Sequence, residues 1–322
     1  MSESPILSVL MPTYNYGRFI GEAIDSVLRQ DFSDYELLVS DDCSTDDTMG
    51  RLESIAGVDG RIRVHKHSKN QGMVANWNWC LREARGKYVL FLFADDYLRF
   101  PGALATLMEP LMRDPTLAMC ASARMLVTEA GVPQIQARDL EREGRYSGDS
   151  VISRCLAEVC NLVGEPSAVI MRRDLALRGF DPGYRQLVDL EMWFYLARQG
   201  GVYFVNRPLV AFRRHGSQQT AVNSRDVSTR MEIYRLLADY LPPSEMEGKS
   251  RREKTRYAVM CYELQRQMLR VPELAVMAKS YRGLLDEGMR LHVGGMLPFW
   301  YRIFKISLKL RISIKKRLRF VV

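Results

Sequence analysis

The sequence predicts an α/β fold: a mostly parallel, Rossmann-like sheet flanked by helices, followed by a helical C-terminal extension. Two observations carry this prediction. In the first hundred residues, three short apolar segments that end in polar residues alternate with stretches of helical length. Beyond residue 220, the chain is rich in Leu, Met, Tyr, Glu and Arg, in patterns that favour helices. The predicted domains are therefore residues 1–220 and residues 221–322.

Each of the three predicted strands ends in side chains that can bind a ligand. The strand predicted at 6–11 ends in Pro12-Thr13-Tyr14-Asn15, the strand at 35–40 ends in Asp41-Asp42, and the strand at 88–93 ends in Ala94-Asp95-Asp96. Helices are predicted between and after them, near 18–31, 46–56 and 73–85. Right-handed crossovers would bring all three strand ends to one edge of a parallel sheet.

The acidic pair Asp95 and Asp96 is the strongest local signal. Adjacent carboxylates repel each other, so a folded site usually gives them a cation or a hydrogen-bonded sugar. Alone, the pair would be better explained as a cap of the helix that Pro101 opens. The second pair, Asp41 and Asp42, favours a shared site, because a helix cap does not explain acids at two strand ends on one edge. We expect such a strand-end site to lie outside the core.

Together these segments resemble the family 2 glycosyltransferases with the GT-A fold, of the kind that builds bacterial surface polysaccharides. The resemblance covers about the first 220 residues. The segments that carry it are 12–15, 41–46, 70–72 with Asn76, and 94–96. It implies that residues 1–220 are a catalytic domain with a nucleotide-sugar site at the strand ends. It places Asp42 on the base, usually uracil, and the remaining donor-binding residues around the base and ribose: Pro12, Thr13, Tyr14, Asn15, Asn70 and Asp95.

The resemblance also implies a divalent metal ion, Mn²⁺ or Mg²⁺, bound on the diphosphate. Asp95 and Asp96 correspond to the family's acidic element, which contacts the ribose and the metal, and either acid could be the main ligand. Phe93 stands where many members carry a further Asp. Carboxylate oxygens suit both ions.

The predicted helix 187–200 contains the implied catalytic base. Val188-Asp189-Leu190-Glu191-Met192-Trp193 resembles the family's Glu-Asp-x-Asp-Leu-Trp segment, with Val188 in place of the first Glu. Aligned on Trp193, the base is Asp189, and Glu191 lies on the diphosphate or acceptor side. Without the resemblance, Asp189 could be simply an acid favoured in the first turn of a helix.

Phe212-Arg213-Arg214-His215 resembles the family's Tyr-Arg-x-His ending. The resemblance implies that Arg213 meets the diphosphate and that His215 binds the diphosphate or the metal. Arginine suits phosphate through its paired donors. The alternative is an ordinary exposed strand end. His65 and His67 alternate on a predicted strand, and we interpret both as surface residues.

Composition and charge place the protein in the cytoplasm. The six cysteines show no CxxC pairs, which indicates reduced thiols without zinc. The N-terminus lacks the features of a signal peptide, and no apolar run reaches the roughly 20 residues of a spanning helix. Residues 301–322 hold eight Lys or Arg and no acid. The pattern of this tail fits either a helix or a strand. Its charge favours binding to an anionic membrane surface over nucleic acid, for which the sequence shows no motif. Alternatively, the tail packs on the domain.

The predicted function is therefore an inverting, metal-dependent glycosyltransferase. It would move a sugar from a nucleotide-linked donor, which we expect to carry UDP, to a hydroxyl of an acceptor. We expect this acceptor to be a lipid-linked saccharide at the inner face of the membrane. Two alternatives stay open: a sugar nucleotidyltransferase, which usually has a glycine-rich phosphate loop after the first strand, and a GT-A scaffold without activity. A dinucleotide-dependent oxidoreductase is disfavoured, because no GxGxxG follows the first strand.

Overall fold

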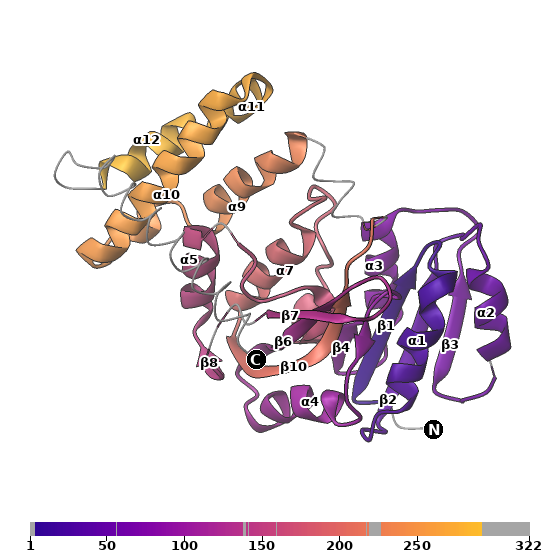
Figure 1. Ribbon diagram of the computed structural model, residues 1–322. Coiled ribbons are helices and arrows are strands. Elements are labelled where there is room, and N and C mark those ends of the chain that lie inside the picture. The colour runs from indigo at the N-terminus through magenta and orange to yellow at the C-terminus, as the bar shows by residue number, and fades with distance from the viewer. Residues whose placement is uncertain are drawn as a thin grey trace. The chain divides into compact units, whose positions relative to one another are not determined.

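The computed structural model describes residues 4–55, 57–137, 140, 142–158, 160–216, 218 and 227–291. The chain divides into two compact units (Figure 1). The first comprises Met1–Val151 and Asn161–Gln218, and the second Ile152–Cys160 and Gln219–Val322. The basic tail, residues 301–322, lies outside the described residues. No sequence signal had assigned the short segment Ile152–Cys160 to the second unit.

A ten-stranded sheet forms the centre of the first unit, in the order β3-β2-β1-β4-β9-β6-β10-β5, with β7 beside β6 and β8 beside β10. The strands are β1 (Leu7–Thr13), β2 (Tyr35–Asp41), β3 (Ile62–Lys66), β4 (Tyr88–Phe91), β5 (Tyr97–Leu98), β6 (Leu117–Val127), β7 (Pro133–Ala137), β8 (Gly144–Tyr146), β9 (Val169–Arg172) and β10 (Gly201–Arg213).

Helices connect the strands and make up most of the second unit. The α-helices are α1 (Gly17–Leu28), α2 (Thr48–Ile55), α3 (Met73–Glu83), α4 (Ala103–Arg113), α5 (Gly148–Glu158), α6 (Arg173–Ala176), α7 (Val188–Ala197), α9 (Glu232–Tyr240), α10 (Arg251–Arg270), α11 (Pro272–Met277) and α12 (Arg282–Arg290). Short 3₁₀ helices are η1 (Pro166–Ala168), η2 (Val227–Met231), η3 (Pro243–Met246) and η4 (Ala278–Tyr281).

The first half of the sheet is parallel, as the sequence predicts. β1 pairs in parallel with β2 and β4, and β2 with β3. In this register Thr13 lies beside Asp41, so the polar ends of β1 and β2 are adjacent. β9 runs antiparallel between β4 and β6, whereas β10 is parallel to β6. The ends of β4, β6 and β10 therefore meet at the same edge as those of β1 and β2.

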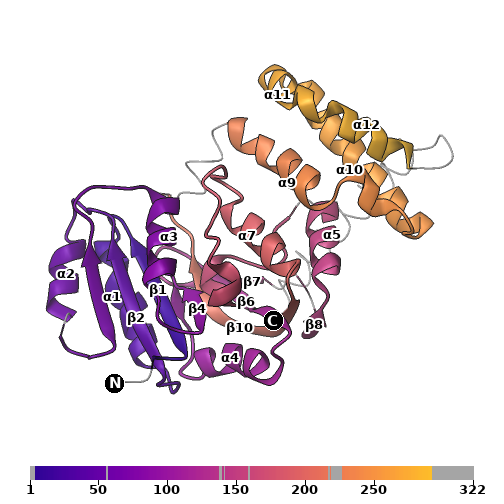
Figure 2. The ribbon, with the colours of Figure 1, turned by 180° about the vertical axis from the view of Figure 1, so that it is seen from behind.

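Burial explains why the first strands have such continuous apolar runs. All seven residues of β1 and all seven of β2 are buried, because helices cover both faces of the sheet. Right-handed crossovers put α1 and α2 on one face and α3 on the other (Figures 1 and 2). The buried face of α1 carries Phe19, Ile20, Ala23, Ile24 and Val27, at helical spacing.

The second unit is helical, as predicted. Ser250 caps α10 in a reciprocal capping box with Glu253, which satisfies free backbone donors of the first turn. α10 and α12 approach closely at Gly288, where a Cβ atom would lie 2.5 Å from Sγ of Cys261. The Tyr234 hydroxyl donates to the Leu264 carbonyl at 2.8 Å and ties α9 to α10.

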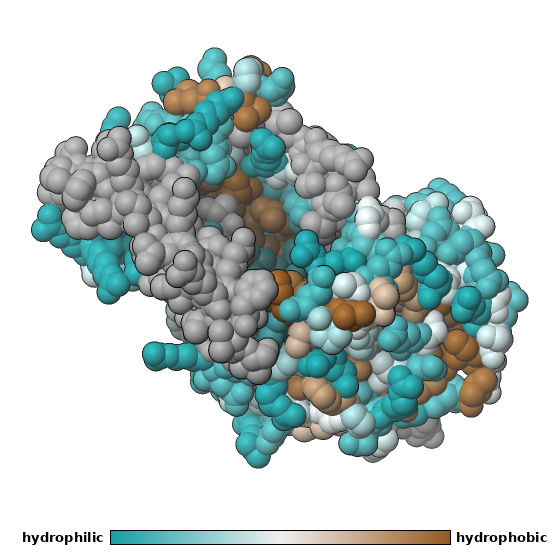
Figure 3. Space-filling view, in the orientation of Figure 1, coloured by the Kyte–Doolittle hydropathy of each residue, from teal (hydrophilic) through white to brown (hydrophobic). Residues whose placement is uncertain are grey.

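The surface of the first unit is mainly hydrophilic in the view of Figure 3, with small separate hydrophobic patches. Exposed large apolar side chains such as Val58 and Val132 lie far apart in the sequence. Isolated exposed apolar residues are normal for a folded protein. Within the described part of the chain, no helix combines the length and apolar character needed to cross a membrane.

Candidate active site

The loops that follow β1 and β2 are locked together at the carboxyl edge of the sheet. Asn15 accepts a hydrogen bond from the Thr45 amide at 2.8 Å, and its own amide donates to the Ser44 hydroxyl at 2.8 Å. Asn15 and Cys43 both have left-handed backbones, with φ of 60° and 64°. Such conformations cost free energy and concentrate at functional sites.

Thr13 and Asp42 lie next to each other where the loops after β1 and β2 meet. Their side chains differ in whether they have hydrogen-bond partners. The Asp42 amide donates to the Thr13 carbonyl at 2.9 Å. The Asp42 carboxylate accepts from the amides of Gln71 and Gly72, at 2.7 and 2.9 Å, and so holds the loop before α3. Thr13 is 2% exposed, yet no described residue hydrogen-bonds its hydroxyl. A buried hydroxyl in this state is a position where a ligand can supply the missing partner.

The other predicted donor-site residues line the same loops. Tyr14 is 43% exposed, Asn70 is exposed, and Pro12 is buried as part of β1. Asn76, by contrast, is buried beneath the loop, where its amide group bonds the Ser40 carbonyl at 3.1 Å. Tyr14 and Asn70 therefore present side chains to solvent at the strand ends, and Asn76 supports the loop from inside.

The interpretation of His67 as a surface residue is wrong. His67 is 4% exposed, and its ring lies 3.1 Å from the Ser40 hydroxyl and 2.6 Å from the Gln71 side chain. His67 points to the same side as His65, with ring centroids 4.7 Å apart, but there the Ser40 and Gln71 side chains and the Trp79 ring cover it. His65 is partly exposed and stacks on Trp79, with ring centroids 4.1 Å apart.

The acidic pair after β4 is more buried than a strand-end position suggested. Asp96 is 1% exposed and accepts hydrogen bonds from the Ser167 hydroxyl at 2.5 Å and from the Arg213 amide at 3.0 Å. Burial and the neighbouring charge of Asp95 raise the pKa of Asp96 well above its usual range. Phe93, at the position of the missing third acid, stacks on Trp77 with centroids 4.9 Å apart. Asp96 therefore belongs to the supporting structure of the site.

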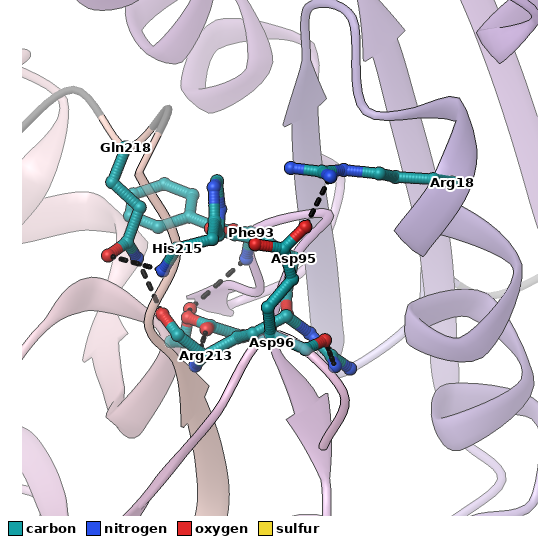
Figure 4. A network of polar contacts seen from close by, with 9 residues as sticks. Arg18, Phe93, Asp95, Asp96, Arg213, His215 and Gln218 are labelled. Carbon is teal, nitrogen blue, oxygen red and sulfur yellow. Dashed lines mark hydrogen bonds and ion pairs between the residues drawn. The ribbon is translucent and has the colours of Figure 1, made fainter.

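His215 places an imidazole nitrogen, a second type of metal-ligand atom, beside the acidic pair Asp95 and Asp96 (Figure 4). Its Nε2 lies 2.9 Å from the Asp95 carboxylate, although 120 residues separate them. The imidazole is buried and packs on Phe19, with centroids 5.1 Å apart. Tyr16 approaches the ring edge-on at 5.8 Å, and burial with the charges of Asp95 and Asp96 raises the pKa of its hydroxyl.

Arg213 uses its guanidinium to hold the acidic pair in place. Nε donates to the Asp95 carbonyl at 2.8 Å, and Nη1 to the Glu129 carbonyl at 2.6 Å. Nη2 forms an ion pair with Glu22, and the side chain is only 4% exposed. By contrast Arg18, at the start of α1, is half exposed and points toward Asp95 in Figure 4.

The side chains around Asp95 fit a divalent cation of the Mn²⁺ or Mg²⁺ type. They offer a carboxylate and an imidazole at hydrogen-bond distance from each other, and both are ligands that Mn²⁺ accepts. No three His, Cys, Asp or Glu side chains in the described ranges form a complete metal cage. An ion held by Asp95 and His215 would need further ligands, such as diphosphate oxygens or water.

Asp189 has the environment expected of a general base near neutral pH. Burial, followed by the charge of Glu165, raises its pKa to about 7. Its carboxylate accepts hydrogen bonds from the Leu190 amide at 2.8 Å and from the Asn161 side chain at 3.0 Å. Glu191 lies two residues further along the helix but is buried, and it forms a two-pronged ion pair with Arg178, at 2.9 and 2.6 Å. Asp189 is thus the acid of this helix with a raised proton affinity.

The segment before β9 links the two acidic centres, and it has no role in the site predicted from the sequence. Asn161 holds Asp189, and six residues later Ser167 holds Asp96 and also accepts from the Phe93 amide at 3.1 Å. The Trp193 indole donates to the Gly164 carbonyl at 2.9 Å, which ties the segment to α7. The signal in the sequence was Gly164-Glu165-Pro166-Ser167, whose polar residues have no local partners.

Comparison with known proteins identifies the family. The model of "Glycosyl transferase family 2" matches residues 8–144. An uncharacterised protein of Mycobacterium tuberculosis (strain CDC 1551) is 30% identical over 257 residues, which cover 76% of this chain and 79% of that protein. The chain belongs to glycosyltransferase family 2. A solved structure of Staphylococcus aureus TarS, residues 1–349 with UDP-GlcNAc, superposes on this family 2 glycosyltransferase with a TM-score of 0.63 and confirms the GT-A fold. It is 18% identical and covers 97% of this chain and 91% of its own.

One relative adds a local similarity to this glycosyltransferase. The GalNAc(5)-diNAcBac-PP-undecaprenol β-1,3-glucosyltransferase of Campylobacter jejuni is 42% identical over 106 residues. These residues cover 33% of this chain and 34% of that enzyme. The similarity is therefore confined to about a third of each protein.

Proposed function

We propose that this family 2 glycosyltransferase transfers a sugar from a UDP-linked donor to an acceptor hydroxyl with inversion. The observation that carries the proposal is that His215 meets the acidic pair at Asp95 after β4, while the neighbouring strand β1 ends in Thr13, whose buried hydroxyl has no partner among the described residues. This arrangement offers cation ligands and a polar contact for a nucleotide at neighbouring strand ends. TarS, of the same fold, was solved with UDP-GlcNAc.

In this proposal the loops after β1 and β2 bind the nucleoside. Thr13, Tyr14 and Asn15 hold the base and ribose, with Pro12 and Asn70 beside them, and Asp42 contacts the base as well as the α3 loop. Arg18 is better placed than Arg213 to meet the diphosphate, because its side chain is 54% exposed although it pairs with Glu129, whereas that of Arg213 is 4% exposed. Glu191, predicted on the diphosphate or acceptor side, would act through its ion pair with Arg178.

The metal would be held by Asp95 and His215, with Asp96 in support. When bound, it supplies positive charge that stabilises the diphosphate as the sugar leaves. Asp189 would remove the proton of the acceptor hydroxyl as that hydroxyl attacks the anomeric carbon. A base and a leaving group on opposite faces of the sugar give inversion in a single displacement.

We further propose a lipid-linked saccharide as the acceptor, in the synthesis of a surface polysaccharide. The similarity to a glucosyltransferase whose name specifies an undecaprenol-linked acceptor supports this choice. The basic tail supports work at the cytoplasmic face of the membrane.

The donor can be named by calorimetry with a panel of nucleotide diphosphates and nucleotide sugars in the presence of Mn²⁺. We expect UDP compounds to bind at least tenfold more tightly than the GDP or ADP compounds. Equal binding of all nucleotides would contradict a uracil-specific site at Asp42.

Replacing Thr13 with Val should weaken UDP binding about tenfold while leaving the unfolding free energy unchanged or slightly higher. The variant keeps the shape of the side chain and removes a buried hydroxyl that lacks a partner, whereas a satisfied hydroxyl would cost about 1 kcal/mol to lose. Thr48→Val is the matched control, because its hydroxyl bonds Asp46 and the Tyr16 amide. It should lower stability. Unchanged UDP affinity in Thr13→Val would remove Thr13 from the donor site.

Removing residues 301–322 should release the protein from anionic liposomes at low salt and leave UDP binding intact. Each of the eight cations contributes up to about 1 kcal/mol near an anionic surface. A flotation assay with and without 0.5 M salt measures this directly. If full-length and truncated proteins float to the same extent, the tail is not the membrane anchor.

A further inference from the structure

Asp189 sits against a short polar segment, residues 161–167, that the proposed mechanism does not use. The side-chain amide of Asn161 makes four hydrogen bonds. Its Nδ2 donates to Asp189 Oδ2 at 3.0 Å and to the Gly164 carbonyl at 3.1 Å. Its Oδ1 accepts from the amides of Val163 and Gly164, at 3.1 and 3.0 Å. With every donor and acceptor in use, Asn161 has one orientation, in which a donor always faces the carboxylate.

Glu165, four residues later, is held beside Asp189 by an ion pair with Arg124 of β6. The Arg124 side chain is 9% exposed and that of Glu165 is 28% exposed. Gly164 makes this approach possible: its φ is +117°, and a Cβ atom there would lie 3.1 Å from Nη1 of Arg124. The left-handed backbone at Gly164 thus brings a carboxylate and its counter-ion to the base.

We infer that Asn161 and Glu165 are positioning residues for Asp189, one directing its carboxylate through a hydrogen bond and the other facing it with a like charge. This inference rests on the proposed role of Asp189 as the base. It assigns to the segment before β9 a function in catalysis that its place in the sequence does not reveal.

The two residues act on the proton affinity of Asp189 in opposite directions. A hydrogen bond from Asn161 stabilises the charged carboxylate, whereas the charge of Glu165 destabilises it. Two further charged groups lie near Asp189. Arg124 of β6 favours the charged form of Asp189. Glu191 of the same helix forms an ion pair with Arg178. The raised pKa of Asp189 agrees with a balance in which Glu165 and burial prevail.

The test follows the Asp189 carboxyl carbon by NMR in protein labelled with ¹³C at the Asp side-chain carboxyl. The resonance is assigned as the one missing from Asp189→Asn. Glu165→Gln should move the titration midpoint of Asp189 down by about one pH unit, and Asn161→Ala should move it up. Glu109→Gln, the same change on an exposed residue of α4, should leave the midpoint unchanged.

A second variant of Asn161 tests whether the effect of Asn161→Ala comes only from a loosened loop. Asn161→Asp keeps the acceptor that bonds Val163 and Gly164 but puts a carboxylate oxygen beside Asp189, so the midpoint should rise further than with Ala. General damage to the loop would move Glu165 and Asn161 variants in the same direction. Shifts in one common direction, or none, would overturn the inference.

This readout separates the inference from the proposed function, because it needs neither donor nor acceptor. If the opposite shifts occur but Asp189→Asn still transfers sugar at the normal rate, then the assignment of the base is wrong and the coupling between these residues stands. If Asp189→Asn is inactive but the midpoint does not move, the base is correct and Asn161 and Glu165 do not position it.

Discussion

Replacing Asp189 with Asn is expected to lower the rate of sugar transfer by roughly 100-fold or more. The amide is nearly isosteric with the carboxylate and cannot accept the proton of the acceptor hydroxyl. UDP binding should be unchanged, because the donor residues lie at the ends of β1, β2 and β4. Transfer kinetics with an identified acceptor measure the first effect and calorimetry the second. Asp149→Asn, which changes an exposed acid paired with Arg198, is the control and should keep full activity.

The pH dependence of the wild-type enzyme should identify the same residue. With a pKa of about 7, Asp189 is protonated in acid, so kcat/KM should fall tenfold per pH unit below that value. An enzyme that keeps full activity at pH 5, or an Asp189→Asn variant with normal turnover, would move the base elsewhere, with Glu191 as the next candidate by sequence.

The stability of the Asp189→Asn variant supplies a further check that does not depend on an acceptor. A carboxyl whose pKa is raised on folding binds more protons in the folded state than in the unfolded state between about pH 4 and pH 7. Wild-type stability therefore loses a contribution as pH rises through this window, and the Asn variant does not. The unfolding free energy of the variant minus that of the wild type should increase from pH 5 to pH 8 in urea denaturation.

Replacing Asp95 with Asn should abolish the effect of Mn²⁺ on UDP binding. In the wild type we expect EDTA to weaken UDP binding at least tenfold, because Asp95 and His215 would hold the ion that offsets the charge of the diphosphate. Calorimetry with Mn²⁺ and with EDTA measures both proteins. Equal affinities in the wild type under the two conditions would contradict a metal-dependent donor site, whatever the result for the variant.

Asp96→Asn separates the two acids of the pair. Asp96 is buried and bonds Ser167 and the Arg213 amide, so this variant should lose about 1–3 kcal/mol of unfolding free energy. Asp95→Asn should lose less, because its side chain contacts His215 at the edge of the site. A loss of Mn²⁺ dependence in Asp96→Asn at unchanged stability would make Asp96 the main ligand instead.

The fold and the positions of the first acids could be predicted because they follow local rules. An apolar run followed by polar residues marks a buried strand and its end, and parallel strands bring those ends together without further information. Thr13, Asp42 and Asp95 were found in this way. The family resemblance added Asp189 and His215, which local pattern alone would have left as a helix-start acid and a strand-end histidine.

The partners of these residues could not be predicted, since they depend on pairings between distant segments. Ser167 reaches Asp96 only because β9 lies antiparallel to β4, and Arg213 reaches it only because β10 ends at the same edge. Nothing near Arg213 in the sequence indicates that its guanidinium donates to the Glu129 carbonyl and forms an ion pair with Glu22. His67 was misjudged for the same reason, because side chains of other segments, Ser40 and Asn76, cover its ring.

The place of β9 between β4 and β6 has a consequence for synthesis on the ribosome. β4 leaves the ribosome with β1 as its partner, but its other edge stays open until β9 emerges about 80 residues later. At typical rates of translation this lasts on the order of 4–16 s. During that time the nascent chain exposes an apolar strand edge at the centre of the future sheet, followed by two acids without Ser167 or His215. Open edges of this kind recruit other strands, so we expect mispairing of the nascent chain in this interval, when a chaperone could protect it.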